Sequence, residues 1–224
     1  MSQMFFAFEG TDGSGKSSMS KYAGAYLTEN GVPNIVVESY PRDENSMFLR
    51  DLWIQKKVPD EMILQIVLEL RKRVLVNQII PALLEGKVVI TDRWHDTTWV
   101  YQGHGMGLGQ DLIGFMMRRF DNTIYTTVSD PVKQRFIEKQ IKNYATVFLR
   151  ASISTSRERV GRRSTDKDAF ELDGDDFFHK VELGFSYRLA GRSRDGNMVI
   201  PINANKFKEE VEADVRDVFL HLIP

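Results

Sequence analysis

Cysteine is absent from this chain of 224 residues. Its absence excludes disulfide bonds, thiolate zinc sites and cysteine nucleophiles, and it fits a reducing compartment. A strong charge of either sign is also lacking, because 30 lysines and arginines nearly balance 31 aspartates and glutamates, for a net charge of -1. Such a balance gives no general attraction to nucleic acid or acidic membranes, so any basic function must be local. We therefore expect no nucleic-acid partner.

Long apolar segments are missing as well. The first residues, MSQMFFAF, contain no basic region and too short an apolar run for a signal peptide. The apolar-looking segment 62–84 contains Glu69, Arg71, Lys72 and Arg73, which makes it costly to place in a bilayer. We expect no membrane partner, and we expect a soluble, cytoplasmic protein.

The pattern of apolar runs predicts an α/β fold in one domain over residues 1–224, because no repeat or Pro/Gly/Ser-rich linker divides the chain. Short apolar runs, expected to be strands, occupy residues 4–8, 34–38, 88–91, 146–150 and 198–202. Helical patterns separate them, one ending near Asn30 and another running from about Asp60 to Gly86. This alternation predicts a parallel sheet covered on both faces. Ligands of such sheets bind beyond the carboxyl ends of the strands.

The segment FEGTDGSGKSS, residues 8–18, follows the first predicted strand and opens a helix. Gly10, four further residues and then Gly15-Lys16-Ser17 match the Walker A pattern for phosphate binding. Lys16 would reach the outer phosphate oxygens, and the Ser17 hydroxyl could ligate Mg²⁺. The expected nucleotide-binding residues are Gly10, Gly13, Ser14, Gly15, Lys16, Ser17 and Ser18.

The segment TDRWHDTTWVYQG, residues 91–103, ends the third predicted strand. Asp92 is placed to reach the shell of the Mg²⁺ ion, and Arg93 to hold a second phosphate in line for attack. The alternative is an Asp-Arg pair that caps the next helix. The chain has no Asn-Lys-x-Asp segment for reading guanine, which weighs against a GTPase.

Four arginines and one glutamate fall within SRERVGRR, residues 156–163. Such a charge run is often a solvated helix face. In a phosphate-binding protein it also suits a lid, here about residues 156–172, whose arginines stabilise charge on a transferring phosphoryl group. Arg159, Arg162 and Arg163 are the candidates.

Taken together, these segments resemble the thymidylate kinase family, and the likeness extends to ESYPR, to LRKRVLVNQIIPALLEGKVVITDRW, to YQG and to DAFE. The resemblance implies a P-loop NTPase-type fold of three layers, with a five-stranded parallel sheet flanked by helices and an arginine-rich lid. It also implies transfer of the γ-phosphate of ATP, with Mg²⁺, to the 5′-phosphate of a deoxynucleoside monophosphate, chiefly dTMP. A homodimer is implied by the resemblance alone.

Positions that match family motifs receive roles by resemblance. Arg42 and Arg93 would bind the 5′-phosphate of the acceptor, and Lys16, Arg93 and the lid arginines would be catalytic. Asp12 would bind the 3′-hydroxyl of the acceptor sugar, a contact that a carboxylate beside Mg²⁺ and lysine can make. The alternative for Asp12 is a simple turn former.

The base and sugar of the acceptor are matched by three further residues. Arg71 would donate to O4 of thymine, Thr98 would contact the base edge, and Tyr101 would pack on the deoxyribose. The alternatives are that Arg71 belongs to a solvated Arg-Lys-Arg face and that Tyr101 is a core aromatic residue.

The chain also departs from the family pattern. Val67 stands where relatives place a phenylalanine that stacks on thymine, and Ala169 stands where the lid has an arginine. Some members have an arginine in the P-loop, where this chain has Gly13 and Ser14. The lid is therefore expected to supply the catalytic arginine. The segment from about residue 123 to residue 146 looks longer than the same region of typical family members. These departures put strict thymine specificity in question.

Three other functions remain open. The chain could phosphorylate a different or modified deoxynucleoside monophosphate. It could be a deoxynucleoside kinase, whose hydroxyl acceptor needs a base such as Glu38, although two acceptor arginines suit an existing phosphate better. Finally, it could be a nucleotide-binding module without turnover.

Overall fold

The computed structural model of the protein describes residues 4–40, 43–55, 57–162 and 174–223. The predicted site residues Arg42 and Arg163 therefore lie outside the described residues, as do Ala169 and most of the segment 156–172 that we expected to form a lid.

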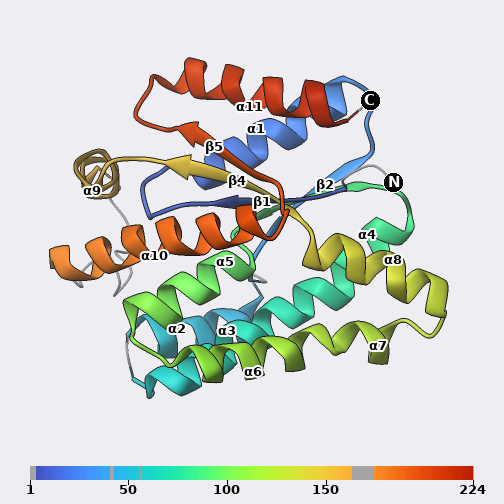
Figure 1. Ribbon diagram of the computed structural model, residues 1–224, viewed down its shortest axis with the longest axis horizontal. Coiled ribbons are helices and arrows are strands. Elements are labelled where there is room, and N and C mark those ends of the chain that lie inside the picture. The colour runs from blue at the N-terminus through green and yellow to red at the C-terminus, as the bar shows by residue number, and fades with distance from the viewer. Residues whose placement is uncertain (1–3, 41–42, 56, 163–173, 224) are drawn as a thin grey trace.

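The centre of the fold is a parallel sheet of five strands, as the sequence predicts (Figure 1). The strands are β1 (Phe5–Glu9), β2 (Asn34–Glu38), β3 (Val88–Asp92), β4 (Ala145–Arg150) and β5 (Val199–Asn203). Each boundary agrees with the predicted strand to within one residue. The strands lie in the order β2-β3-β1-β4-β5. Because β1 is central, the loop after it emerges between the carboxyl ends of β3 and β4, where parallel sheets bind their ligands.

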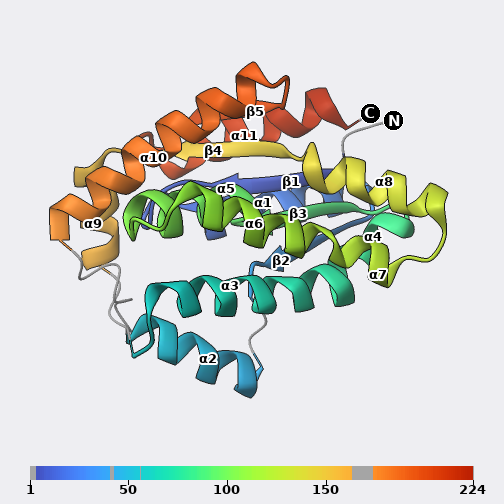
Figure 2. The ribbon, with the colours of Figure 1, turned by 60° about the horizontal axis from the view of Figure 1, so that its bottom comes forward.

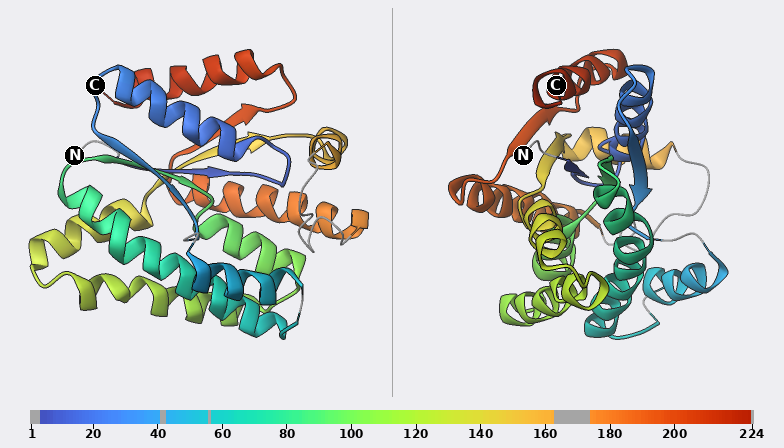
Figure 3. Two further views of the ribbon diagram at one scale, coloured as in Figure 1. Left: turned by 180° about the vertical axis from the view of Figure 1, so that it is seen from behind. Right: turned by 90° about the vertical axis from the view of Figure 1, so that its right-hand side faces the viewer.

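Helices cover both faces of the sheet (Figures 1 and 3). The helices are α1 (Lys16–Glu29), α2 (Glu44–Ile54), α3 (Asp60–Val74), α4 (Ile80–Leu84), α5 (His95–Thr98), α6 (Gln110–Asp121), α7 (Thr123–Thr127), α8 (Pro131–Lys142), α9 (Ile153–Gly161), α10 (Gly174–Arg194) and α11 (Lys208–Leu222), with π-helical segments η1 (Leu75–Ile79) and η2 (Trp99–Gly105). One face carries α1 and α11, and the opposite face carries α3, α4, α6, α8 and α10, whereas α9 lies beyond the end of β4 (Figures 1 and 2). The three layers confirm the predicted fold class.

Strand β1 shows why both faces are covered. Phe6 and Phe8 pack into the hydrophobic cluster under α1 and α11, whereas Phe5 and Ala7 pack into the cluster on the other face. Successive side chains of a strand point to opposite faces, so a strand that is apolar at every position must be buried on both sides. The run of phenylalanines in β1 therefore fixes its central place in the sheet.

The long helix predicted from Asp60 to Gly86 is interrupted. The structure divides it into α3, the π-helical segment η1 and α4. Pro81 has no N–H to donate to the carbonyl four residues earlier, and a widened turn just before it accommodates that loss. The end is as predicted, because Gly86 takes a positive φ of 78° and its N–H donates to Leu83 O at 3.1 Å.

The region from about 123 to 146, which looks longer than usual in the sequence, contains two helices and the start of β4. It contains α7 and α8, and the Asp130 side chain caps α8 by accepting from the N–H groups of Val132 and Lys133 at 2.8 and 3.1 Å. Among the helices of the described ranges, none has the length and apolar character that crossing a membrane requires.

Candidate active site

The loop between β1 and α1 forms a tight turn that only glycine permits at key points. Gly13 and Gly15 have φ values of 81° and 95°, in the left-handed region that side chains disfavour. A Cβ on Gly13 would lie 2.2 Å from the carbonyl oxygen of Ser156 in α9. The Walker A glycines therefore let the loop turn and let its backbone approach α9 closely.

Lys16, the first residue of α1, is a buried cation. Its side chain is 5% exposed, and its Nζ donates to the carbonyl oxygen of Thr11 at 2.6 Å. Burial removes the ammonium from water and Arg93 repels it, which together lower the pKa of Lys16 to about 8. A buried cation of this kind is stabilised when an anion binds beside it.

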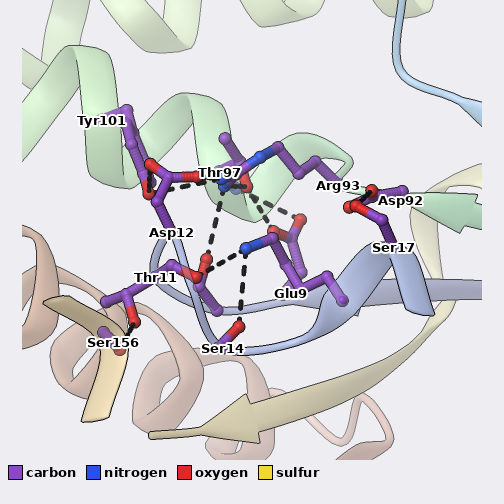
Figure 4. A network of polar contacts seen from close by, with 12 residues as sticks. Glu9, Thr11, Asp12, Ser14, Ser17, Asp92, Arg93, Thr97, Tyr101 and Ser156 are labelled. Atoms are coloured by element: carbon purple, nitrogen blue, oxygen red, sulfur yellow. Dashed lines mark hydrogen bonds and ion pairs between the residues drawn. The ribbon is translucent and has the colours of Figure 1, made fainter. Parts of the chain in front are cut away.

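Ser17 and Asp92 meet at the carboxyl ends of β1 and β3 (Figure 4). The Ser17 hydroxyl donates to Oδ2 of Asp92. The other carboxylate oxygen, Oδ1, is buried without a hydrogen-bond partner in the described part of the chain. Mg²⁺ in phosphate-binding enzymes commonly takes one or two protein oxygens, with phosphate oxygens and water completing its shell. The donor pair therefore fits a Mg²⁺ ion that is bound together with a nucleotide.

Arg93 points back at the P-loop, where it meets Asp12 and Tyr101 (Figure 4). Its guanidinium forms an ion pair with Asp12 and lies 3.3 Å from the carbonyl oxygen of Gly10. The Tyr101 hydroxyl donates to Oδ2 of Asp12 at 2.8 Å. Burial raises the pKa of Tyr101 well above its ordinary value, so the hydroxyl stays protonated and donates. Asp12 thus contacts both Arg93 and Tyr101, which goes beyond a turn-forming role.

Tyr101 is a core aromatic residue, one of the two interpretations that the sequence left open, and its contact with a deoxyribose stays a prediction. Its ring packs among the aromatic side chains of α10, at 5.9 Å from the ring of Phe177 and 6.4 Å from that of Phe185. Its face also lies 4.8 Å from the guanidinium carbon of Arg93. The residue is thus a core aromatic whose polar end reaches the site.

Arg71 and Thr98 are brought together from α3 and α5. Arg71 is fully buried, and its Nη1 donates to Oγ1 of Thr98 at 2.5 Å. The interpretation as part of a solvated Arg-Lys-Arg face is wrong for Arg71, although it holds for the exposed Lys72 and Arg73. The Nε of Arg71 has no hydrogen-bond partner among the described residues. A buried guanidinium with an unused donor is suited to a ligand that presents a hydrogen-bond acceptor.

Of the expected lid arginines, two lie within the described residues. Arg159 is half-buried on α9, and Arg162 follows that helix. Arg162 pairs with Glu158 one turn earlier at 2.5 Å, with both side chains largely exposed. In this state Arg162 behaves as part of a solvated helix face. Val67 is fully buried in α3, one turn before Arg71.

Sequence reasoning missed Glu9, which has no exposed surface. Its carboxylate accepts from the backbone N–H of Trp94 at 2.8 Å and of Thr97 at 3.2 Å, at the start of α5. Burial, and then the nearby charge of Asp96, raise the pKa of Glu9. Glu9 thus caps α5, the role that the sequence offered as an alternative for Asp92 and Arg93. The sequence signal that could have identified Glu9 as a buried, hydrogen-bonded carboxylate is its place at the end of an otherwise apolar strand.

The comparisons with known proteins agree with one another. The family model described as thymidylate kinase matches residues 8–134. A protein of Kosmotoga olearia named thymidylate kinase is 26% identical over 219 residues, which cover 97% of this chain and 95% of that protein. The thymidylate kinase of Wolbachia pipientis subsp. Culex pipiens is 29% identical, covering 96% of this chain and 95% of the relative. The thymidylate kinase of Wolbachia pipientis wMel is 30% identical, over 81% of this chain and 83% of that relative.

Proposed function

Because the chain belongs to the thymidylate kinase family and is thereby a phosphotransferase, we propose that it transfers the γ-phosphoryl group of ATP to the 5′-phosphate of dTMP. The observation that carries this proposal is the position of Arg93. Its guanidinium lies 3.3 Å from the carbonyl oxygen of Gly10, on the P-loop that also carries Lys16. A cation that faces the phosphate loop from a neighbouring strand suits a second phosphate, brought up to the first for in-line attack.

On the donor side, Lys16 and the backbone N–H groups of residues 13–18 would hold the phosphates of ATP. Lys16 gives up its bond to the Thr11 carbonyl oxygen and turns to the phosphate oxygens. Ser17 and Asp92 would hold Mg²⁺, which when bound neutralises charge on the phosphates. Arg159 on α9 is a further candidate to stabilise the transferring group.

On the acceptor side, the 5′-phosphate would compete with Asp12 for Arg93, since both are anions. The carboxylate released from Arg93 can then accept a hydrogen bond from a sugar hydroxyl, while Tyr101 stays beside it. No general base is required, because the attacking phosphate oxygen is already ionised. Arg71, with its unused Nε donor, would bind a carbonyl oxygen of the base next to Thr98.

An acceptor panel tests the proposed function. ADP release is measured with ATP and Mg²⁺ while dTMP, dUMP, 5-substituted dUMPs, dCMP, dAMP, dGMP and thymidine are offered in parallel. We expect turnover with dTMP. We also expect turnover with other 5-substituted dUMPs, because Val67 is smaller than the phenylalanine of relatives and offers no aromatic ring that would select thymine by stacking. Turnover with thymidine alone would contradict the proposal and indicate a deoxynucleoside kinase in which Glu38 is the base. Absence of turnover with every acceptor would indicate a nucleotide-binding module. The homodimer and the cytoplasmic location stay predictions.

Proton uptake on ATP binding should report the environment of Lys16. The pKa of Lys16 is lowered to about 8 in the ligand-free protein, and the negative phosphates of ATP should raise it. Between pH 8 and 9 the fraction of Lys16 that is neutral must therefore take up a proton as ATP binds, and affinity should fall as pH rises through this range.

Calorimetry of ATP binding at pH 8.5 in two buffers of different ionisation enthalpy measures this uptake, roughly half a proton or more by the same reasoning. The variant Lys21→Ala, which removes an exposed lysine of α1, should show the same uptake. Equal heats in the two buffers would contradict the prediction.

A further inference from the structure

The backbone of Arg93 adopts an unfavourable conformation. Its φ is 71°, and among the described residues it is the one non-glycine residue with a positive φ. A side chain with a Cβ avoids this region, and bulky residues persist there only when the surroundings over-determine them. The contacts around Arg93 must therefore stabilise this backbone conformation against its intrinsic cost.

Two hydroxyl groups hold the carbonyl end of the peptide bond between Arg93 and Trp94. Ser39, which follows β2, donates to the Arg93 carbonyl oxygen at 2.7 Å and also to that of Asp92. Thr91 of β3 donates to the same Arg93 oxygen at 2.8 Å. Both residues are buried, Ser39 being 3% and Thr91 0% exposed. The oxygen is thus held by one donor from β3 and one from the residue that follows β2.

Glu9 holds the other end of the same peptide bond. The N–H of Trp94 donates to Oε1 of Glu9 at 2.8 Å. Glu9 is itself kept in place by Thr97, whose N–H donates to Oε1 at 3.2 Å and whose hydroxyl donates to Oε2. The Arg93–Trp94 peptide therefore has no freedom to rotate without breaking buried hydrogen bonds, which is costly.

We propose that Glu9, Ser39 and Thr91 form a peptide clamp that positions Arg93 for phosphoryl transfer. The clamp keeps Arg93 in the left-handed conformation, and that conformation turns its side chain from the end of β3 back toward Gly10 and Asp12. None of the three side chains needs to touch a substrate. They are positioning residues, and their role rests on the proposed function of Arg93 at the acceptor phosphate.

A double-mutant cycle separates positioning from general stability. Ser39→Ala, Thr91→Val and Glu9→Gln are each made in the natural chain and in the Arg93→Gly variant. In the natural chain each should lower kcat/KM for dTMP by roughly tenfold and leave KM for ATP within about twofold. In the Arg93→Gly chain each should change kcat/KM by less than about twofold, because glycine needs no clamp and has no guanidinium to position.

Thr146→Val is the matched control for Thr91→Val. Thr146 is also a fully buried strand threonine, and its hydroxyl donates to Asp96 rather than to the Arg93 peptide. It should leave kcat/KM for dTMP unchanged within about twofold. Equal losses for the clamp variants with and without Arg93 would overturn the proposal, since they would show a general structural role.

A readout without turnover distinguishes this proposal from the proposed function. In a crystal structure of the Ser39→Ala, Thr91→Val double variant, Arg93 should leave the left-handed region and its guanidinium should leave the Gly10 carbonyl oxygen. Unchanged Arg93 φ and guanidinium position would overturn the clamp, whether or not the enzyme turns over dTMP. Absence of turnover in the natural chain would instead count against the proposed function alone.

Discussion

Replacing Arg93 by alanine should lower kcat with dTMP by roughly 10³-fold, the low end of the effect of an arginine that stabilises a phosphoryl-transfer transition state. Two losses combine in this variant. The acceptor phosphate loses the cation that binds it. The Asp12 carboxylate also loses its ion-pair partner, so its negative charge repels the acceptor phosphate. ATP binding should stay within about twofold of normal, because Lys16, Ser17 and the P-loop glycines are untouched.

Steady-state kinetics with saturating ATP measure the loss in Arg93→Ala, and calorimetry measures ATP affinity. Arg118→Ala is the control, because it removes an exposed arginine of α6 and should leave kcat unchanged. A normal kcat in Arg93→Ala would refute the role assigned to Arg93. A parallel loss of ATP affinity would move Arg93 to the donor side of the site.

Replacing Lys16 by alanine should lower kcat by roughly 10²–10³-fold, because an enclosed cation aimed at developing negative charge contributes about this much. The stability of the ligand-free protein should not fall. Lys16 is a buried ammonium whose pKa is lowered by burial, so its removal relieves a desolvation cost. The carbonyl oxygen of Thr11 and the hydroxyl oxygen of Ser14, 2.6 and 3.5 Å from Nζ, are the two acceptors that lose a donor.

Turnover and thermal unfolding of Lys16→Ala are compared with those of Lys21→Ala, which removes an exposed lysine of the same helix. Full turnover in Lys16→Ala would contradict the P-loop assignment. A large drop in Tm would mean that the loss of activity reports damaged folding, and the role of Lys16 would then have to be read from the milder Lys16→Arg.

The fold could be predicted from the sequence because its signals are local. The apolar run that contains Phe5 to Phe8 predicts a strand that is buried on both faces, and the structure places it at the centre of the sheet. The Walker A glycines likewise carry their own conformational signal, since Gly13 and Gly15 adopt positive φ. Short-range patterns of this kind depend little on the rest of the chain.

Contacts between distant segments could not be predicted in the same way. Arg71 is buried and donates hydrogen bonds to Thr98 of α5 and to Tyr40 in the loop after β2, contacts that its place in an Arg-Lys-Arg run does not reveal. The hydrogen bonds of Glu9 and Ser39 to the Arg93 segment cross between strands, and the positive φ of Arg93 has no signature in a residue that is not glycine.

In the proposed reaction an existing phosphate, rather than a hydroxyl, receives the phosphoryl group. Phosphorus NMR of a mixture of the protein, ATP, Mg²⁺ and dTMP tests it most directly, with an identical sample containing thymidine beside it. We expect the dTMP singlet to be replaced by the coupled pair of doublets of a nucleoside diphosphate, and thymidine to be left unchanged. A new monophosphate singlet from thymidine, with dTMP unaltered, would contradict the proposed reaction.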